Sequence, residues 1–99
     1  MQYLITGQIL NISDVHTFGK NERLKQTIVL TCQNSGDNRL EYLVFDAFSQ
    51  DVFDHIEEKN LAIGDSISIL FQHIGRMSVN KDKKVCYYEN KQILNIKLL

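Results

Sequence analysis

Between residues 42 and 71 the spacing of hydrophobic side chains changes twice, which predicts a strand, a short helix, a tight turn and a second strand. Residues 42–48 are rich in β-branched and aromatic side chains, as in a largely buried strand. The next apolar residues recur at helical spacing, and they are Val52, Phe53, Ile56 and Leu61. Residues 64–65, Gly-Asp, predict a turn, after which residues 66–71 alternate between polar and apolar side chains as a strand does.

The predicted helix has a clear start signal. Ser49 is the better N-cap of two candidates, because its hydroxyl can accept a hydrogen bond from an amide of the first turn, and Asp51 places a negative charge at the positive end of the helix dipole. Residues 59–60, Lys-Asn, close the other end. A single short helix inside an otherwise strand-rich chain restricts the fold to few classes.

In all, three strands precede the helix, and the one at residues 42–48 belongs to the third of them. The first spans about residues 3–12, and Gly7 inside it predicts a bulge or sharp bend of the kind that closes a small barrel. After a polar loop, the second spans about residues 22–32, with Leu24 facing in and the basic residues on either side of it facing out. Residues 33–38 predict a hairpin turn into a third strand at about residues 39–47.

The C-terminal part of the chain supplies one more strand. Residues 75–84 are polar and basic, which predicts a second long loop, and a fifth strand follows at about residues 85–97, bent near residues 89–91. The order is therefore β-β-β-α-β-β. The sequence predicts an all-β protein with one short helix, folded as a five-stranded OB-fold barrel, in which the face of strands two and three and two long loops hold oligonucleotides. An SH3-like barrel, which lacks the internal helix, and an open α+β sheet are the alternatives.

Composition narrows the class of protein. A length of 99 residues predicts a single domain over residues 1–99, and a formal net charge of −1 means that any nucleic-acid binding must come from a local basic patch. No apolar run reaches the roughly 20 residues of a membrane span, and the N-terminus lacks the features of a signal peptide, so we expect a cytoplasmic protein. Cys32 and Cys86 lie far apart without a histidine or cysteine at ligand spacing, which predicts buried thiols, no metal site and no cofactor.

The sequence gives little support for catalysis. His16, His55 and His73 are scattered over a loop, the helix and a strand end, and neither a nucleophile nor metal-ligand spacing accompanies any of them. The glycine of the turn at residues 64–65 is followed by no glycine cluster or lysine, so this turn is not a phosphate-binding loop. We therefore expect a protein without enzymatic activity.

Three segments carry a resemblance to a known family. Residues 3–10 (Tyr-Leu-Ile-Thr-Gly-Gln-Ile-Leu), residues 44–53 and residues 61–69 resemble the corresponding segments of the bacterial single-stranded-DNA-binding and primosomal replication proteins. In that family the first segment is an apolar strand with a glycine before its second half. The second leaves strand three through an aromatic and enters the helix, and the third leads into strand four.

The resemblance implies a single-stranded nucleic acid ligand, with DNA favoured over RNA. It places the stacking aromatic at the end of strand three on Phe45, facing outward, with Leu40, Tyr42 and Val44 inside. The chain contains no tryptophan and ends after strand five without the acidic tail of the general strand-coating proteins. The resemblance thus implies a specialised accessory factor in DNA replication or recombination.

One concave face is expected to gather the basic and aromatic side chains of the loops and of strands two and three. Acidic residues cluster around the helix instead, and such segregation of charge on a near-neutral chain predicts a polar functional face. The predicted nucleic-acid-binding residues are Phe18, Lys20, Arg23, Lys25, Arg39, Phe45, Arg76, Lys81, Lys83, Lys84 and Tyr87. Each of them, taken singly, could instead be an ordinary solvated side chain.

A second hypothesis belongs to a different class. The near-neutral charge, the absence of tryptophan and the apolar C-terminus also fit a small protein-interaction subunit that binds a larger replication enzyme and has little nucleic acid affinity of its own. Leu94, Leu98 and Leu99 could form the contact. The same residues leave open a homodimer through the C-terminal strand.

Overall fold

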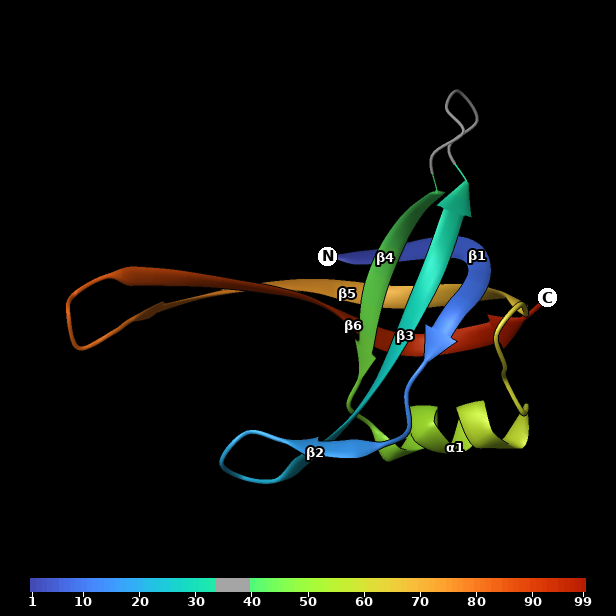
Figure 1. The fold of residues 1–99 in the computed structure, drawn as a ribbon, viewed down its shortest axis with the longest axis horizontal. Helices are drawn as coiled ribbons and strands as arrows, with labels where there is room; N and C mark the ends of the chain where they lie inside the picture. The colour runs from blue at the N-terminus through green and yellow to red at the C-terminus, as the bar shows by residue number, and fades with distance from the viewer. Residues whose placement is uncertain (34–39) are drawn as a thin grey trace.

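A computed structural model of the chain describes the backbone of residues 1–33 and 40–99. Strands dominate it, and one helix lies between the fourth and fifth strands along the chain (Figure 1). The elements are β1 (Gln2–Ile12), β2 (His16–Phe18), β3 (Arg23–Gln33), β4 (Leu40–Ala47), α1 (Gln50–Glu58), β5 (Ser66–Val79) and β6 (Val85–Leu98).

Strand β1 closes the sheet into a barrel. Its residues 2–8 pair with β5, and its residues 8–12 pair with β3, so the strand changes partner just after Gly7. A Cβ atom on Gly7 would lie 2.7 Å from the carbonyl oxygen of Thr31, which is closer than a side chain allows. The predicted bend therefore lies where only glycine lets two backbones approach.

The core fills this barrel, and α1 covers one end of it. Val52, Phe53 and Ile56 of the helix are buried among side chains from every long strand. The predicted cap is confirmed, because the Ser49 hydroxyl accepts a hydrogen bond from the amide of Val52 at 3.3 Å, and Asp51 lies in the first turn. The helix is therefore held by its apolar stripe on one side and by a local capping bond at its start.

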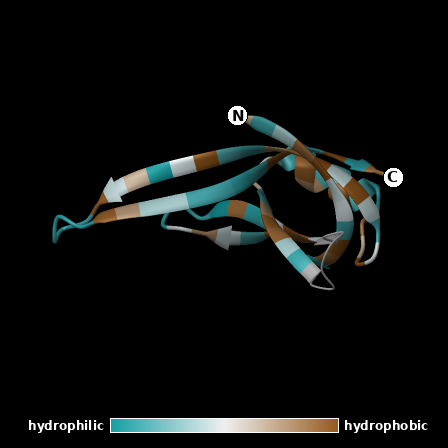
Figure 2. Ribbon diagram, turned by 90° about the horizontal axis from the view of Figure 1, so that it is seen from above, coloured by the Kyte–Doolittle hydropathy of each residue, from teal (hydrophilic) through white to brown (hydrophobic). Residues whose placement is uncertain are grey.

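Residues 75–84 differ most from the sequence-based prediction, which made them a loop. Strand β5 continues to Val79, β6 begins at Val85, and the two form a long antiparallel hairpin, here called the arm, that projects from the barrel (Figures 1 and 2). The radius of gyration of 15.1 Å accordingly exceeds the roughly 13 Å of a compact domain of about 100 residues. Both faces of the arm are exposed to solvent, so its sequence lacks the buried side from which strands are usually recognised.

The first long loop also contains a strand that was not predicted. The short β2 pairs with the start of β3, and this extends β3 into a second, smaller ribbon, here called the β2–β3 hairpin. Leu24 pairs with Thr17 in it and is 44% exposed, so the prediction that Leu24 faces the core is wrong. The ribbon has already left the barrel at this point, and the core ends at Gln26.

The five long strands and the helix otherwise follow the predicted order β-β-β-α-β-β, and the fold class is confirmed.

Cys86 is half-buried on the arm rather than in the core, so the prediction of a buried thiol is wrong for this residue. The side chains of Cys32 and Leu40 lie outside the described residues. In the part of the chain that the structure describes, no helix is long and apolar enough to span a membrane.

Candidate nucleic-acid interface

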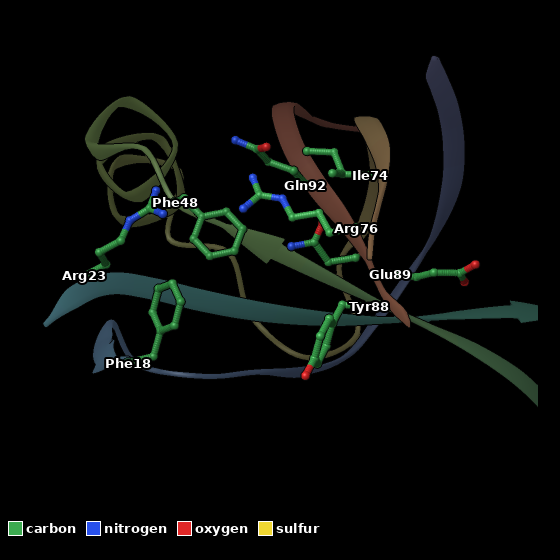
Figure 3. Close-up of a pocket in the computed structure, with 9 residues that line it drawn as sticks. Phe18, Arg23, Phe48, Ile74, Arg76, Tyr88, Glu89 and Gln92 are labelled. Atoms are coloured by element: carbon green, nitrogen blue, oxygen red, sulfur yellow. The ribbon is translucent and has the colours of Figure 1, made fainter. Parts of the chain in front are cut away.

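The β2–β3 hairpin and the arm form two walls of one groove. Between them lies a cavity of about 160 Å³, and Figure 3 shows aromatic and arginine side chains from both walls around it. The residues that line it include Phe18, Arg23, Phe48, Arg76, Tyr88 and Gln92. They come from five separate segments of the chain, so the groove exists only in the folded protein.

One wall is built on a pair of phenylalanine rings. Phe18 of β2 and Phe48, which follows β4, lie with ring centroids 5.5 Å apart at an interplanar angle of 52°. The guanidinium carbon of Arg23 lies 6.0 Å from the centroid of Phe18 and 5.9 Å from that of Phe48. Arginine held over aromatic rings keeps its charge and its planar donor fork available to an anion at the rim.

The opposite wall belongs to the arm. Arg76 of β5 and Tyr88 of β6 are direct cross-strand partners and therefore share one face of the arm, which is the face toward the groove. Tyr88 is 59% exposed. Asn90 and Ile74 form the next pair on the same face, and the buried Oδ1 of Asn90 has no hydrogen-bond partner among the residues that the structure describes. This wall thus offers an aromatic face, a cation and amide groups.

Beyond the cavity, β3 and β4 present an outer face to solvent. Val29 pairs with Val44 and Thr31 with Tyr42, and these residues point away from the core. Tyr42 is 65% exposed and Val44 41% exposed. The prediction that both face the core is therefore wrong, and the exposed Tyr42 gives this face an aromatic side chain that was not expected there.

Phe45 is the reverse case. The sequence placed it on the outer face as a stacking residue, but it is 0% exposed, and its ring meets Phe71 edge-on at a centroid distance of 4.9 Å. Its register partner is Ile28, whose side chain faces the core, and cross-strand partners share a face. Phe45 is thus a core residue that cannot stack on a base.

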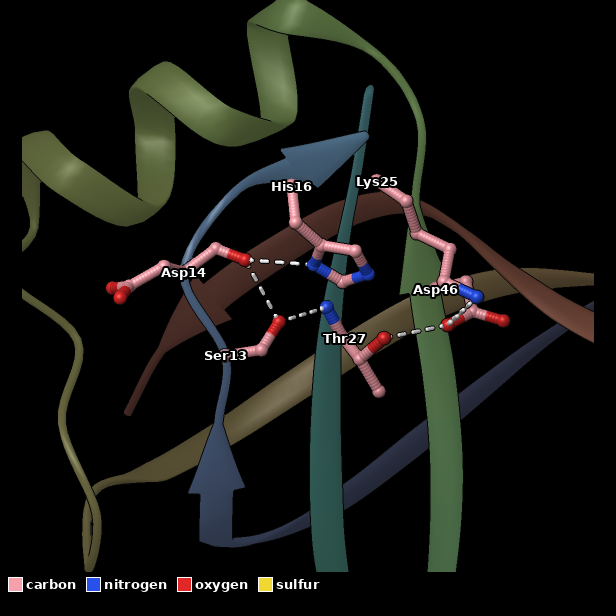
Figure 4. Close-up of polar contacts among 6 residues, drawn as sticks. All are labelled: Ser13, Asp14, His16, Lys25, Thr27 and Asp46. Atoms are coloured by element: carbon pink, nitrogen blue, oxygen red, sulfur yellow. Dashed lines mark hydrogen bonds and ion pairs between the residues drawn. The ribbon is translucent and has the colours of Figure 1, made fainter. Parts of the chain in front are cut away.

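Lys25 is in the predicted place but is not free. Its ammonium nitrogen lies 5.3 Å from the centroid of Phe18 and 3.9 Å from Oδ1 of Asp46. The same carboxylate oxygen accepts a hydrogen bond of 2.9 Å from the Thr27 hydroxyl (Figure 4). On the other side of β3, the Ser13 hydroxyl accepts from the amide of Thr27 and fixes the start of the first loop. Asp46 therefore offsets much of the charge that Lys25 brings to the groove.

The remaining predicted residues lie outside the cavity. Lys20 is exposed in the turn of the β2–β3 hairpin, and Tyr87, 76% exposed, lies opposite Met77 on the other face of the arm. The lysines of the arm, Lys81, Lys83 and Lys84, are exposed at its tip. There the Asn80 side chain accepts hydrogen bonds from two backbone amides and shapes the turn. Arg39 lies outside the described residues.

Sequence reasoning missed Phe48, Tyr88 and Gln92. A signal existed for Tyr88. A strand through residues 85–91 places residues 87 and 88 on opposite faces, so only one of the two tyrosines can share a face with Arg76. No such signal existed for Phe48. It follows the end of β4, and its ring pairs with Phe18 of a distant segment.

A five-stranded barrel with a helix between its third and fourth long strands, and a groove bounded by two hairpins, has the architecture of an OB-fold. Solved structures support this assignment. The mitochondrial single-stranded DNA-binding protein Rim1 of S. cerevisiae superposes with a TM-score of 0.71 at 13% identity, over 100% of this chain and 94% of that one. The Plasmodium falciparum SSB in complex with ssDNA gives a TM-score of 0.65 at 11% identity, over 99% and 93%. In sequence the chain matches no family profile and no curated protein.

Proposed function

We propose that the chain binds single-stranded DNA in the groove between the β2–β3 hairpin and the arm. One observation carries the proposal: the OB-fold brings Phe18, Phe48 and Tyr88 around a single cavity together with Arg23 and Arg76. Exposed aromatic faces beside cations are the means by which OB-folds hold unpaired bases and their phosphates. Duplex DNA keeps its bases stacked and cannot use these rings.

The groove supplies two kinds of binding energy. Stacking of a base on an aromatic side chain contributes about 1–3 kcal/mol, and each neutralised phosphate adds a salt-dependent contribution from released counterions. The formal net charge of −1 gives no long-range attraction, so the two arginines must supply most of the second contribution. We therefore infer modest affinity with a shallow dependence on salt.

The similar structures fit this proposal. One neighbour is a mitochondrial single-stranded DNA-binding protein, and another was solved with ssDNA bound. A binding protein of this kind, without a catalytic activity of its own, would serve as an accessory factor in DNA replication or recombination. At 11–13% identity these structures support the fold, and the residue roles rest on the groove of this chain.

The test is a fluorescence-anisotropy titration of the full chain with labelled single-stranded DNA, single-stranded RNA and duplex DNA of equal length. At about 50 mM salt we expect single-stranded DNA to bind, with a weaker signal at about 200 mM because phosphate contacts are lost. Duplex DNA should bind at least about tenfold more weakly, since its bases cannot reach the rings. Equal binding of duplex and single strands, or none at the lower salt, would reject the proposal.

The interaction-subunit hypothesis receives less support. Of its three leucines, Leu94 is partly buried, while Leu98 and Leu99 are 42% and 64% exposed at the end of β6. Two neighbouring exposed leucines make a small patch, and single exposed apolar residues are common on monomers. The homodimer through this strand stays a hypothesis, which light scattering of the wild-type chain would test.

A further inference from the structure

A second cavity lies on the other side of the β2–β3 hairpin, between that hairpin and α1. It is an open depression with a volume of about 380 Å³. Its lining combines apolar, amide and acidic side chains, chiefly Val15, Leu24, Gln26, Phe53, Asp14 and Glu57. None of these residues lines the groove described above.

The β2–β3 hairpin separates the two sites. Arg23 and Leu24 are consecutive residues of β3, so their side chains point to opposite faces of the ribbon. Arg23 lies in the groove, and Leu24 lies in the second cavity. A ligand in one site therefore does not compete for space with a ligand in the other.

The walls of the second cavity are apolar and accessible. Val15 is 42% exposed and Leu24 is 44% exposed, while Phe53 and Ile56 of α1 form a buried floor. Apolar side chains held open on a ribbon and a helix can cover an alkyl chain.

Two carboxylates and one amide oxygen of the cavity lack partners among the described residues. Neither Asp14 nor Glu57 forms an ion pair with a residue that the structure describes. Gln26 is 8% exposed and donates from Nε2 to the carbonyl oxygen of Ser13 at 2.8 Å, yet its Oε1 accepts no hydrogen bond from any described residue. A buried acceptor without a donor is costly, and Gln26 lines the same cavity as Asp14 and Glu57.

We propose that this cavity is a docking site for a lysine side chain presented by a partner protein. Lysine combines an alkyl stem, which fits against Val15 and Leu24, with a cationic donor, which suits Asp14, Glu57 and the free acceptor of Gln26. The rest of a basic segment would meet the exposed acidic face of α1, which includes Asp51, Asp54 and Glu58. A nucleic acid is disfavoured here because these carboxylates repel phosphate.

The test uses the full chain, labelled with nitrogen-15, and a blocked pentapeptide of sequence Ala-Lys-Ala-Lys-Ala. We expect the peptide to shift the backbone amide signals of Leu24, Gln26 and Phe53 in a saturable way. The same peptide with both lysines acetylated keeps the alkyl stems but loses the charge, and it should leave these signals in place. Equal shifts from both peptides, or shifts confined to residues outside the cavity, would overturn the proposal.

A matched pair of variants separates a site from a general acidic surface. Glu57 lines the cavity and Glu58 does not, although both are exposed residues of α1. Glu57→Lys should weaken peptide binding by about 5-fold, which is the upper end of the range for an exposed ion pair, while Glu58→Lys should change it far less. Equal losses in both variants would show only a diffuse charge effect and would contradict the site. Both variants change net charge equally, so their single-stranded DNA affinities should agree with each other.

Discussion

The barrel interior and the groove each receive a phenylalanine from the same short segment, and the two residues have opposite fates. Phe45 lies within β4 and is fully buried against Phe71. Phe48 lies just beyond the strand and pairs with Phe18 at the groove. The interior is therefore set by strand alternation, whereas the groove is set by where strands end and which distant segments meet there.

The largest effect is expected from Phe45→Ala. Truncation of a fully buried phenylalanine loses its transfer energy and leaves a cavity, so the free energy of unfolding should fall by about 3–5 kcal/mol. Urea denaturation followed by circular dichroism measures it. If the folded variant lost its affinity for single-stranded DNA while keeping its stability, Phe45 would belong to the groove after all.

Phe48→Ala should show the reverse behaviour. Losing one stacking surface should weaken single-stranded DNA binding by about 1–3 kcal/mol, or roughly 5- to 150-fold. Because Phe48 is only half-buried, the loss of stability should be clearly smaller than that of Phe45→Ala. Anisotropy and urea denaturation on the same preparation give both numbers. A variant that is unstable but binds normally would place Phe48 in the core instead.

Gly7→Ala tests the place where β1 changes partner. The added methyl group would meet the Thr31 carbonyl oxygen at 2.7 Å, and a backbone atom cannot move aside cheaply. We expect a loss of about 1–3 kcal/mol of stability, as for overpacking of a filled site. Gly75→Ala is the control, because no atom lies within 4 Å of a Cβ there. Equal stabilities of the two variants would mean that the barrel closes without this close approach.

Ser49→Ala should have the smallest effect on stability. It removes the hydroxyl that accepts from the Val52 amide, which costs about 1 kcal/mol at an N-cap. Ser78 of the arm is exposed and makes no side-chain hydrogen bond to a described residue, so Ser78→Ala provides the control. A thermal shift no larger than that of the control would show that the cap does not stabilise α1.

Much of the barrel could be predicted from local sequence. The change from strand to helical spacing located α1, Ser49 gave its start, and Gly7 located the bend of β1. Aligning β4 with the resembling family assigned its inner and outer faces wrongly. A shift of one residue in such an alignment exchanges the two faces of a strand. Asp46 carried the correcting signal, since Tyr42, Val44 and Asp46 share a face and a carboxylate belongs outside.

The arm and the groove could not be predicted from local sequence, for physical reasons. With both faces exposed, residues 75–84 show no buried side and read as a loop. Phe18, Phe48 and Tyr88 are far apart in the sequence and meet only through the packing of the two hairpins. The sequence located the basic residues on both walls, but it could not show which aromatic residues stand beside them.

The central claim is that bases stack in the groove, and one comparison tests it most directly. Tyr88 and Tyr87 are neighbours on the arm, yet Tyr88 faces the groove and Tyr87 faces away from it. Anisotropy with single-stranded DNA at about 50 mM salt should show Tyr88→Ala binding at least about fivefold more weakly than wild type, the lower end of one stacking contact. Tyr87→Ala should bind as wild type does. Equal losses in the two variants, or a loss only in Tyr87→Ala, would contradict the account.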